Sequence, residues 1–374
     1  TSLGLLSGFA FAAFYATLGI PIAKYADRGN RRNLISISLA IWSLMTALSG
    51  LAQNFLHLLL ARIGVGIGEA GCSPPAHSMI SDYFPANKRS TALGIYSLGI
   101  PFGIMFGLFA GGWIDEMFGW RTAFFIVGVP GILIAIIFRF TVKEPIRGQA
   151  EGKVASENQP TIYETITYLL RKKSFRHLAF AASLAAFVGY GGINWLPSFF
   201  QRSYGMPTSD VGWYLGLILG LPGGLGIFLG GYLSDYFGSR DVRWSLWVAA
   251  IAMGITAPLY YLVYMSPTAT TSLLWLIIPV ALGNFYQAAT FSQTQGVVEL
   301  KMRSVAAAIL LFIINIIGLG FGPSAVGIVS DILQSEYGKE SLRYSLLIFA
   351  SLKIWCAFHY YMAGRYLKDD LVTN

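Results

Sequence analysis

The stretch AKYADRGNRR, residues Ala23–Arg32, recurs later in the chain as GYLSDYFGSR, residues Gly231–Arg240. Each copy ends an apolar segment and places an aspartate a few residues before an arginine. The second aspartate, Asp235, follows the first, Asp27, by 208 residues. A loop that returns at such a distance indicates a tandem repeat, in which the chain consists of two similar halves.

A second pair of matching residues supports this repeat. Arg89-Ser90 begins one apolar segment, and Arg303-Ser304 begins another 214 residues later. The two offsets nearly agree, so the repeat unit is about 210 residues long. The second half has one apolar segment, 177–201, before its copy of the loop, and the first half has none. We therefore expect one further helix to precede Thr1, which would make six helices in each half.

The composition places the chain in a membrane. Hydrophobic residues make up 55% of its 374 residues, charged residues only 12%, and the mean hydropathy is +0.59. Soluble domains carry about 25% charged residues, because their surfaces must stay in water. The net charge of +8 and the pI near 9.4 reflect basic loops that set membrane topology, so we expect no nucleic-acid partner.

Apolar runs of about 20 residues span a bilayer, and the sequence contains eleven such candidates. They are residues 3–25, 33–52, 57–83, 90–113, 120–140, 177–201, 211–234, 244–265, 272–298, 304–330 and 342–366. The long polar connection in the middle divides the chain into an N-terminal helical half (1–140), a linker (141–175) and a C-terminal helical half (176–374). Within the linker, residues 162–170 have the apolar face of a helix, either lying on the membrane surface or simply solvated.

The basic residues predict the orientation. If the Asp27 loop is cytoplasmic, 20 Lys and Arg residues lie on that side and only 4 on the other. This bias follows the positive-inside rule and predicts that both termini are cytoplasmic. The two halves then share one orientation, which is the parallel-repeat arrangement of many transporters.

The repeated loop is a candidate conformational switch. An aspartate at a helix end can accept hydrogen bonds from the start of a neighbouring helix, and this contact must break when the halves move. The residues that we assign to the switch are Asp27, Arg28, Arg31, Arg32, Asp235 and Arg240.

Glu69 is the only one of 18 acidic residues that lies well inside an apolar segment. A carboxyl group at membrane depth is a functional candidate, so we predict Glu69 as the proton-coupling residue. Arg62 lies seven residues earlier on the same helical face, about 10.5 Å away along the axis. We predict that Arg62 binds substrate. A purely structural role for this buried pair is the alternative.

Polar side chains in the second half are candidates for the substrate cavity, although polar residues also bond helices to one another. They are Tyr190, Asn194, Asn284, Gln287 and Asn315. The glycines of Gly66-x-Gly68-x-x-Gly71 match a dinucleotide-binding fingerprint, but they lie in an apolar segment rather than after a strand. We read them as close-packing positions between helices.

Two series of glycines recur every four residues, which places each series on one helical face. They are Gly99, Gly103, Gly107 and Gly111 in one segment and Gly212, Gly216, Gly220 and Gly224 in another. Such faces predict either a sliding seam between the halves or static close packing.

Several stretches resemble the Spinster family of the major facilitator superfamily: ARIGVGIGEAG, PPAHSMISDYFPANKRSTALGIYSLGIPFG, and GWRTAFFIVGVPGILIA ending in VKEPIRG. The resemblance is clearest over Gly19–Gly148. It implies an all-α fold of two six-helix halves and a proton-linked carrier of lysophospholipid or sphingoid-like substrates. Organic-anion and sugar-acid symporters share the Gly-x-Gly-Glu-Ala stretch and remain an alternative.

The sequence therefore predicts a secondary transporter in the plasma (inner) membrane, if the chain is bacterial. Its expected partners are a small amphipathic or anionic substrate, protons and membrane lipid, and we expect it to act as a monomer. We expect no cofactor, metal site or catalytic residue, because no nucleophile with a base or paired carboxylates lies at membrane depth. A non-transporting sensor on the same fold is a further alternative.

Overall fold

The structure, a computed structural model, describes residues 10–152 and 160–372. Residues 3–9 of the first predicted span lie outside the described residues. Within the described part, side-chain positions are not described for residues 10–16, 108, 110–113, 115 and 116. Every regular element in the described residues is a helix, which confirms the predicted all-α class.

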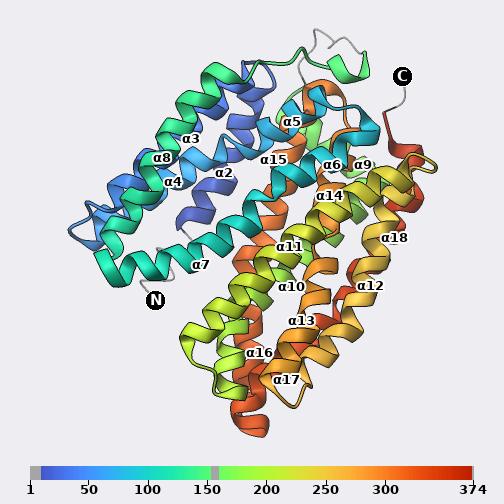
Figure 1. The fold of residues 1–374 in the computed structure, drawn as a ribbon. Helices are drawn as coiled ribbons and strands as arrows, with labels where there is room; N and C mark the ends of the chain where they lie inside the picture. The colour runs from blue at the N-terminus through green and yellow to red at the C-terminus, as the bar shows by residue number, and fades with distance from the viewer. Residues whose placement is uncertain (1–9, 153–159, 373–374) are drawn as a thin grey trace.

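The described residues of the first half form seven helices, several of which join into longer rods (Figure 1). They are α2 (Ala10–Ala26), α3 (Arg31–Ser49), α4 (Phe55–Ala70), α5 (Ser73–Tyr83), α6 (Ala86–Ser97), α7 (Gly99–Phe118) and α8 (Trp120–Thr141). Two of these helices have a side-chain N-cap. The Asn30 side chain accepts a hydrogen bond from the Asn33 backbone N–H at the start of α3, and the Asn54 side chain accepts one from the His57 backbone N–H at the start of α4. These caps satisfy N–H groups that have no partner inside the helix.

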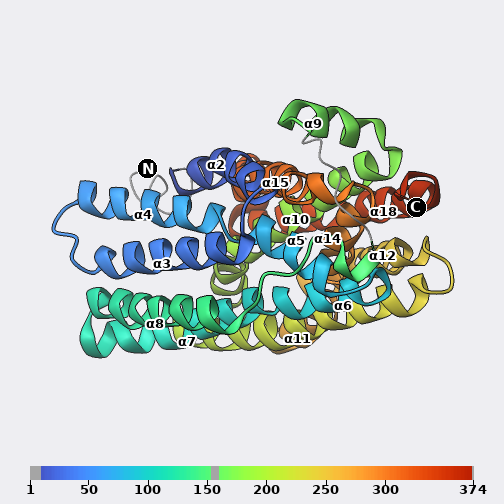
Figure 2. The ribbon, with the colours of Figure 1, turned by 90° about the horizontal axis from the view of Figure 1, so that it is seen from above.

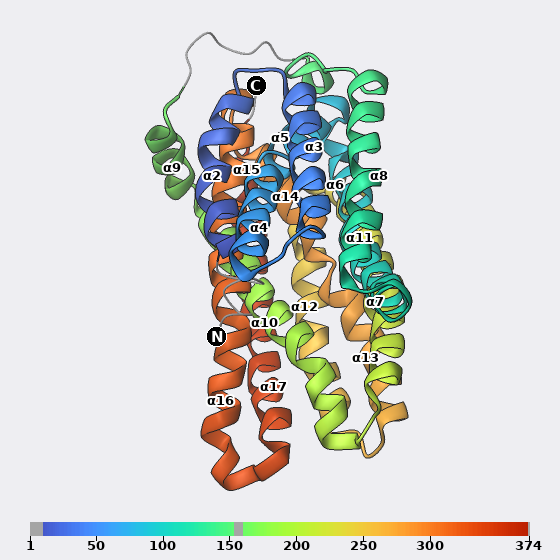
Figure 3. The same ribbon diagram turned by 90° about the vertical axis from the view of Figure 1, so that its left-hand side faces the viewer.

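The linker contributes a short 3₁₀ turn, η2 (Gln149–Glu151), and the helix α9 (Ile162–Arg171). Thr161 and Glu164 form a capping box at the start of α9. Leu169 on this helix is fully buried in the core of the second half, and α9 contacts α10 and α15. Figures 2 and 3 show α9 on the outer side of these helices. It is therefore a packed helix and not a freely solvated one.

The second half follows the same order of rods as the first. Its helices are α10 (Lys173–Tyr204), α11 (Thr208–Gly238), α12 (Trp244–Tyr264), α13 (Ala269–Gly283), α14 (Tyr286–Gly296), η3 (Leu300–Met302), α15 (Arg303–Ile314), the π-helix η4 (Asn315–Phe321), α16 (Gly322–Tyr337), η5 (Gly338–Glu340), α17 (Ser341–Ser351) and α18 (Lys353–Asp370). Each of the eleven predicted spans corresponds to one rod, and the predicted linker lies between the end of α8 and the start of α10.

The outer surface is apolar, as a bilayer requires. On α8, for example, Val127, Leu133, Ile137 and Phe140 are 58–80% exposed. Eight helical stretches of the described residues are long and apolar enough to cross a membrane, by length and composition; the last one, Leu300–Asp370, runs through several consecutive helices.

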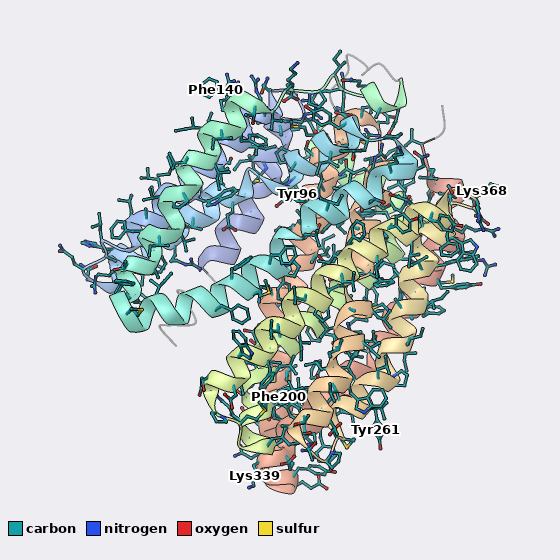
Figure 4. The ribbon with its side chains drawn as sticks, viewed as in Figure 1. Tyr96, Phe140, Phe200, Tyr261, Lys339 and Lys368 are labelled. Atoms are coloured by element: carbon teal, nitrogen blue, oxygen red, sulfur yellow. The ribbon has the colours of Figure 1, made fainter. Side chains whose placement is uncertain are left out.

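Two lysines mark the ends of the molecule in Figure 4: Lys339 lies at one end and Lys368 at the other. The end that carries Lys368, η2 and α9 is called the linker end below, and the end that carries Lys339 is called the distal end. In Figure 1, α3, α4 and α8 approach the second half at the linker end and diverge from α16 and α17 toward the distal end.

Candidate transport cavity and its linker-end closure

The aspartate of the first loop binds the second half of the molecule. Asp27 is 1% exposed, and its carboxylate oxygens accept hydrogen bonds from the backbone N–H groups of Ser304 (3.0 Å) and Val305 (3.2 Å). These N–H groups lie in the first turn of α15, where no carbonyl of the helix itself can bond them. The positive end of the helix dipole also favours the carboxylate there.

The aspartate of the second loop binds the first half in the same way. Asp235 accepts from the backbone N–H groups of Ser90 (3.1 Å) and Thr91 (2.7 Å) and from the Thr91 hydroxyl (2.7 Å), in the second turn of α6. Asp27 of the first half thus binds the backbone at Ser304, and Asp235 of the second half binds the backbone at Ser90. Each half supplies one aspartate that accepts hydrogen bonds from a helix of the other half. We call these two contacts the reciprocal caps.

Ion pairs surround the reciprocal caps. Arg31 is fully buried and contacts Asp82 at 2.5 Å and Glu144 at 2.8 Å. Asp82 also contacts Arg303 of the second half at 3.2 Å. Asp82 therefore joins an arginine from each half and strengthens the closure of the linker end.

The linker itself bridges the two halves. Glu151 of η2 pairs with both Arg89 and Arg303, the two arginines that mark the repeat. Burial favours the neutral acid, but Arg303 and Arg89 outweigh it and lower the pKa of the Glu151 carboxyl to about 2. The bridge is therefore ionised at every physiological pH.

The other basic residues of the predicted switch have different positions. Arg32 donates its backbone N–H to Glu144 at 2.8 Å, so it joins the edge of the cluster. Arg28 is exposed, and Arg240 is exposed and donates to the Tyr236 hydroxyl. Of the predicted switch residues, Asp27 and Asp235 thus bind the other half directly, whereas Arg31 and Arg32 belong to the surrounding cluster within the first half.

A cavity of about 560 Å³ lies between the halves, lined by residues from both. Several rods are interrupted where they reach it. Asn284 follows the end of α13, Asn315 begins the π-helix η4, and Lys353 begins α18 after a break at Leu352. Transporters place discontinuous helices at their binding sites in this way, because the breaks free polar groups at membrane depth.

Four predicted cavity residues line this space: Tyr190, Asn284, Gln287 and Asn315. Gln287 donates its amide N–H to the Asn284 side chain at 2.8 Å, so these two residues form one polar unit. Asn194 is exposed, donates to the Tyr190 carbonyl and does not belong to the lining.

Glu69 and Arg62 lie on α4 outside the lining of this cavity. Both are partly buried. The Glu69 carboxylate makes no hydrogen bond or ion pair with another described residue. Two turns further along, His77 is 2% exposed, lines the cavity and stacks against Phe291 with ring centres 4.5 Å apart. His77 therefore reaches the cavity, whereas Glu69 does not.

The glycine interpretation is confirmed on α4. A Cβ atom on Gly68 would lie 2.7 Å from the backbone of Trp42, and one on Gly71 would lie 2.1 Å from the Ser38 hydroxyl. Only glycine permits this approach between α3 and α4, so the fingerprint motif is a packing feature.

The two glycine series behave differently. On α11, a Cβ atom on Gly216 or Gly220 would lie 2.7 Å from Phe109 or Met105 of α7. On α7, Gly99, Gly103 and Gly107 have no atom within 4 Å of such a Cβ position. The prediction of two facing smooth surfaces is therefore wrong for α7, because its large side chains fill the grooves left by the glycines of α11.

The profile of the Major Facilitator Superfamily matches residues 1–323. An MFS-type efflux pump of Mycolicibacterium smegmatis is 32% identical over 375 residues, which cover 100% of this chain and 86% of that protein. The hexuronate transporter of Bacillus subtilis is 25% identical over 372 residues, which cover 95% of this chain and 85% of that protein.

A solved structure agrees with the fold. It is the crystal structure of a bacterial homologue of the human lysosomal transporter Spinster, in an inward-facing and unoccupied conformation. It aligns with a TM-score of 0.69 and 31% sequence identity, covering 100% of this chain and 91% of that chain. The chain belongs to the Major Facilitator Superfamily and is a membrane transporter, not an enzyme. Within that superfamily it is a Spinster-like transporter.

Proposed function

We propose that the protein moves an amphipathic or anionic organic solute, such as a lysophospholipid or sphingoid-like molecule, by proton-coupled alternating access. The observation that carries this proposal is the pair of reciprocal caps. They hold the halves together at the linker end, while the cavity lies between the halves. Contacts of this kind stabilise one state of a carrier and break when the halves rock.

The orientation follows from the basic residues. The linker end carries the large excess of Lys and Arg, so we assign it to the cytoplasm. The described conformation is then closed to the cytoplasm, and substrate reaches the cavity from the distal side. We assign a monomer to this cycle, because one chain supplies both halves.

We propose Glu69 as the proton-coupling residue. A carboxylate at membrane depth is costly when it is ionised, and Glu69 has no described hydrogen-bond partner. Protonation removes this cost and eases closure of the protein around it. His77, eight residues further along the chain and in the lining of the cavity, is our candidate to extend the proton path.

The amphipathic character of the substrate is supported by the cavity wall, which combines aliphatic and aromatic side chains with Tyr190, Asn284, Gln287 and Asn315. We propose these four residues as substrate contacts. Arg62 and Asn194 lie outside the lining, so we propose them as contacts on the path into the cavity. Substrate affinity measured on Arg62→Ala tests this role, which an unchanged affinity and uptake rate would exclude.

A proton-coupled symporter of a hydrophilic organic acid or sugar acid is the second candidate. It is favoured by the similarity to the hexuronate transporter. Counterflow into proteoliposomes separates the two, with labelled lysophospholipids in one arm and labelled hexuronate in the other. We expect exchange of the lysophospholipid. Exchange of hexuronate alone would favour the second candidate, and exchange of neither would refute the substrate classes proposed here.

A further inference from the structure

Lys353 is the only Lys, Arg, Asp or Glu among the described residues that line the cavity. It is 3% exposed and stands at the start of α18, directly after the break at Leu352. Leu346 and Ala350 line the same cavity. Their spacing of four and three residues places all three side chains on one face of the interrupted rod.

Within residues 10–152 and 160–372, the ammonium group has no partner of opposite charge. Lys353 makes no hydrogen bond or ion pair with any described residue, and its closest aromatic contact is the Tyr260 ring, 5.7 Å from the nitrogen. Buried ammonium groups are normally paired, because leaving water is costly for a charge. An ionisable residue at this depth therefore indicates a functional role that is completed by something outside the described residues.

The position of Gly283 explains how the buried charge of Lys353 is tolerated when no anion is bound. The Lys353 nitrogen lies 3.3 Å from the position of a Cβ atom on Gly283, the last residue of α13. The carbonyl end of a helix carries partial negative charge and favours a cation. Because Gly283 has no side chain, the ammonium approaches this helix end and remains directed toward the cavity.

Neighbouring groups complete a site for an anion. The hydroxyls of Tyr190, Tyr260 and Tyr286 line the cavity and form no hydrogen bond with described residues. Each can donate one hydrogen bond, and the lysine can donate three. No lining side chain is a carboxylate that would repel an anion. Around these donors the wall is apolar, with Leu311, Ile314, Leu346 and Phe349.

We propose that Lys353 binds the carboxylate or phosphate group of an amphipathic substrate, whose apolar part packs against this wall. The inference rests on the proposed transport function and deepens it. It places the residue that recognises the charged group of the substrate in the second half, at the break between α17 and α18. Arg62, by contrast, lies on α4 outside the cavity lining.

The test measures binding of matched ligands to purified protein in nanodiscs. The probes are a lysophosphatidate, a fatty acid and a monoacylglycerol with the same acyl chain, so that only the head group differs. For Lys353→Met, which keeps the length and loses the charge, we expect affinity for one or both anions to fall about tenfold or more, as for a lost charged hydrogen bond. Binding of the neutral monoacylglycerol should stay at the wild-type level.

The two anionic arms identify the head group. A loss confined to lysophosphatidate assigns a phosphate, and a loss confined to the fatty acid assigns a carboxylate. Lys368→Met is the matched control, because Lys368 lies exposed near the end of the same helix. It should bind all three probes as wild type does.

A charge-rescue experiment guards against misfolding of Lys353→Met. Lys353→Cys is prepared with Cys72→Ala and Cys356→Ala, which removes the two native thiols. Modification with 2-aminoethyl methanethiosulfonate restores a positive group of nearly lysine length, whereas methyl methanethiosulfonate adds a neutral one. We expect only the amine reagent to restore binding of the anion.

The outcomes separate this inference from the transport proposal. If wild type exchanges an anionic amphiphile but Lys353→Met binds it equally well, the inference is wrong and the transport proposal stands. If Lys353→Met weakens the neutral and anionic probes alike, and the amine reagent restores neither, Lys353 is a structural residue. If wild type exchanges no amphiphile in counterflow, the proposed function fails.

Discussion

The Asp27 carboxylate caps the helix that begins beside Ser304, 277 residues further along the chain, while Asp235 binds the backbone of Ser90 in return. The crosswise pairing has a mechanical consequence. Both contacts must break when a rotation separates the halves at the linker end. Both therefore contribute to the equilibrium between the closed and the open state of that end.

Asp27→Asn should open the linker end. Burial outweighs the N–H groups of Ser304 and Val305, which favour the ionised form, so the pKa of the carboxyl is raised to about 6 in the closed state. At pH 8 the group is ionised and both oxygens are in use, and an amide supplies only one acceptor. We expect a cost of about 1 kcal/mol to the closed state.

Distances between spin labels on the two halves at the linker end, measured at pH 8, report this shift. Asp235→Asn should give a similar change, because its contacts are equivalent. Asp241→Asn is the control, since Asp241 pairs with Arg243 in the same loop and touches no group across the halves. A shift toward closure in Asp27→Asn would mean that removing the buried charge favours the closed state more than losing one acceptor disfavours it.

Glu151→Gln should also open the linker end, and its effect should not depend on pH between 5.5 and 8. The pKa of Glu151 is lowered to about 2 in the closed state, from an ordinary value of 4.5. A depressed pKa stabilises closure above the ordinary value, and this contribution is lost only as the pH falls from 4.5 toward 2. The measurement is the difference in label distances between Glu151→Gln and wild type across this pH range. A difference that vanished at pH 5.5 would contradict the bridge.

The seam between α7 and α11 predicts unequal effects of two similar substitutions. Gly220→Ala places a Cβ atom 2.7 Å from Met105, so the helices must shift. We expect a loss of about 1–3 kcal/mol in stability, seen as a lower melting temperature of the purified protein. Gly103→Ala meets no atom within 4 Å and should be as stable as wild type. Equal melting temperatures for the two variants would argue against a tight seam.

The sequence predicted the eleven rods and the binding of Asp27 and Asp235 to neighbouring helices, because apolar length and a repeated loop are local signals; their role as a switch stays a prediction. It did not predict Glu151, since nothing in the linker sequence indicates that one carboxylate meets arginines of both halves. Lys353 was missed although a signal existed: it is a single lysine inside the apolar segment 342–366. The error concerning α7 has a similar origin, because glycine spacing defines a face but not what lies opposite.

Glu69→Gln should separate proton coupling from substrate exchange. The amide resembles the protonated acid, so accumulation driven by a pH gradient should fall to background. Counterflow at equal pH should persist, because exchange needs no net proton movement. Both are measured on the same vesicles, with Glu336→Gln as an exposed control at the distal end. Gradient-driven accumulation at the wild-type level by Glu69→Gln would exclude it as the coupling residue.

In the proposed transport cycle, the two ends of the molecule open in alternation. The most direct test of this alternation is a pair of distance measurements in a background of Cys72→Ala and Cys356→Ala. One pair of labels replaces Lys88 and Lys368 at the linker end, and the other replaces Trp120 and Lys339 at the distal end. We predict that Asp27→Asn with Asp235→Asn lengthens the first distance and shortens the second. Distances that stay unchanged, or that lengthen together at both ends, would contradict alternating access through this closure.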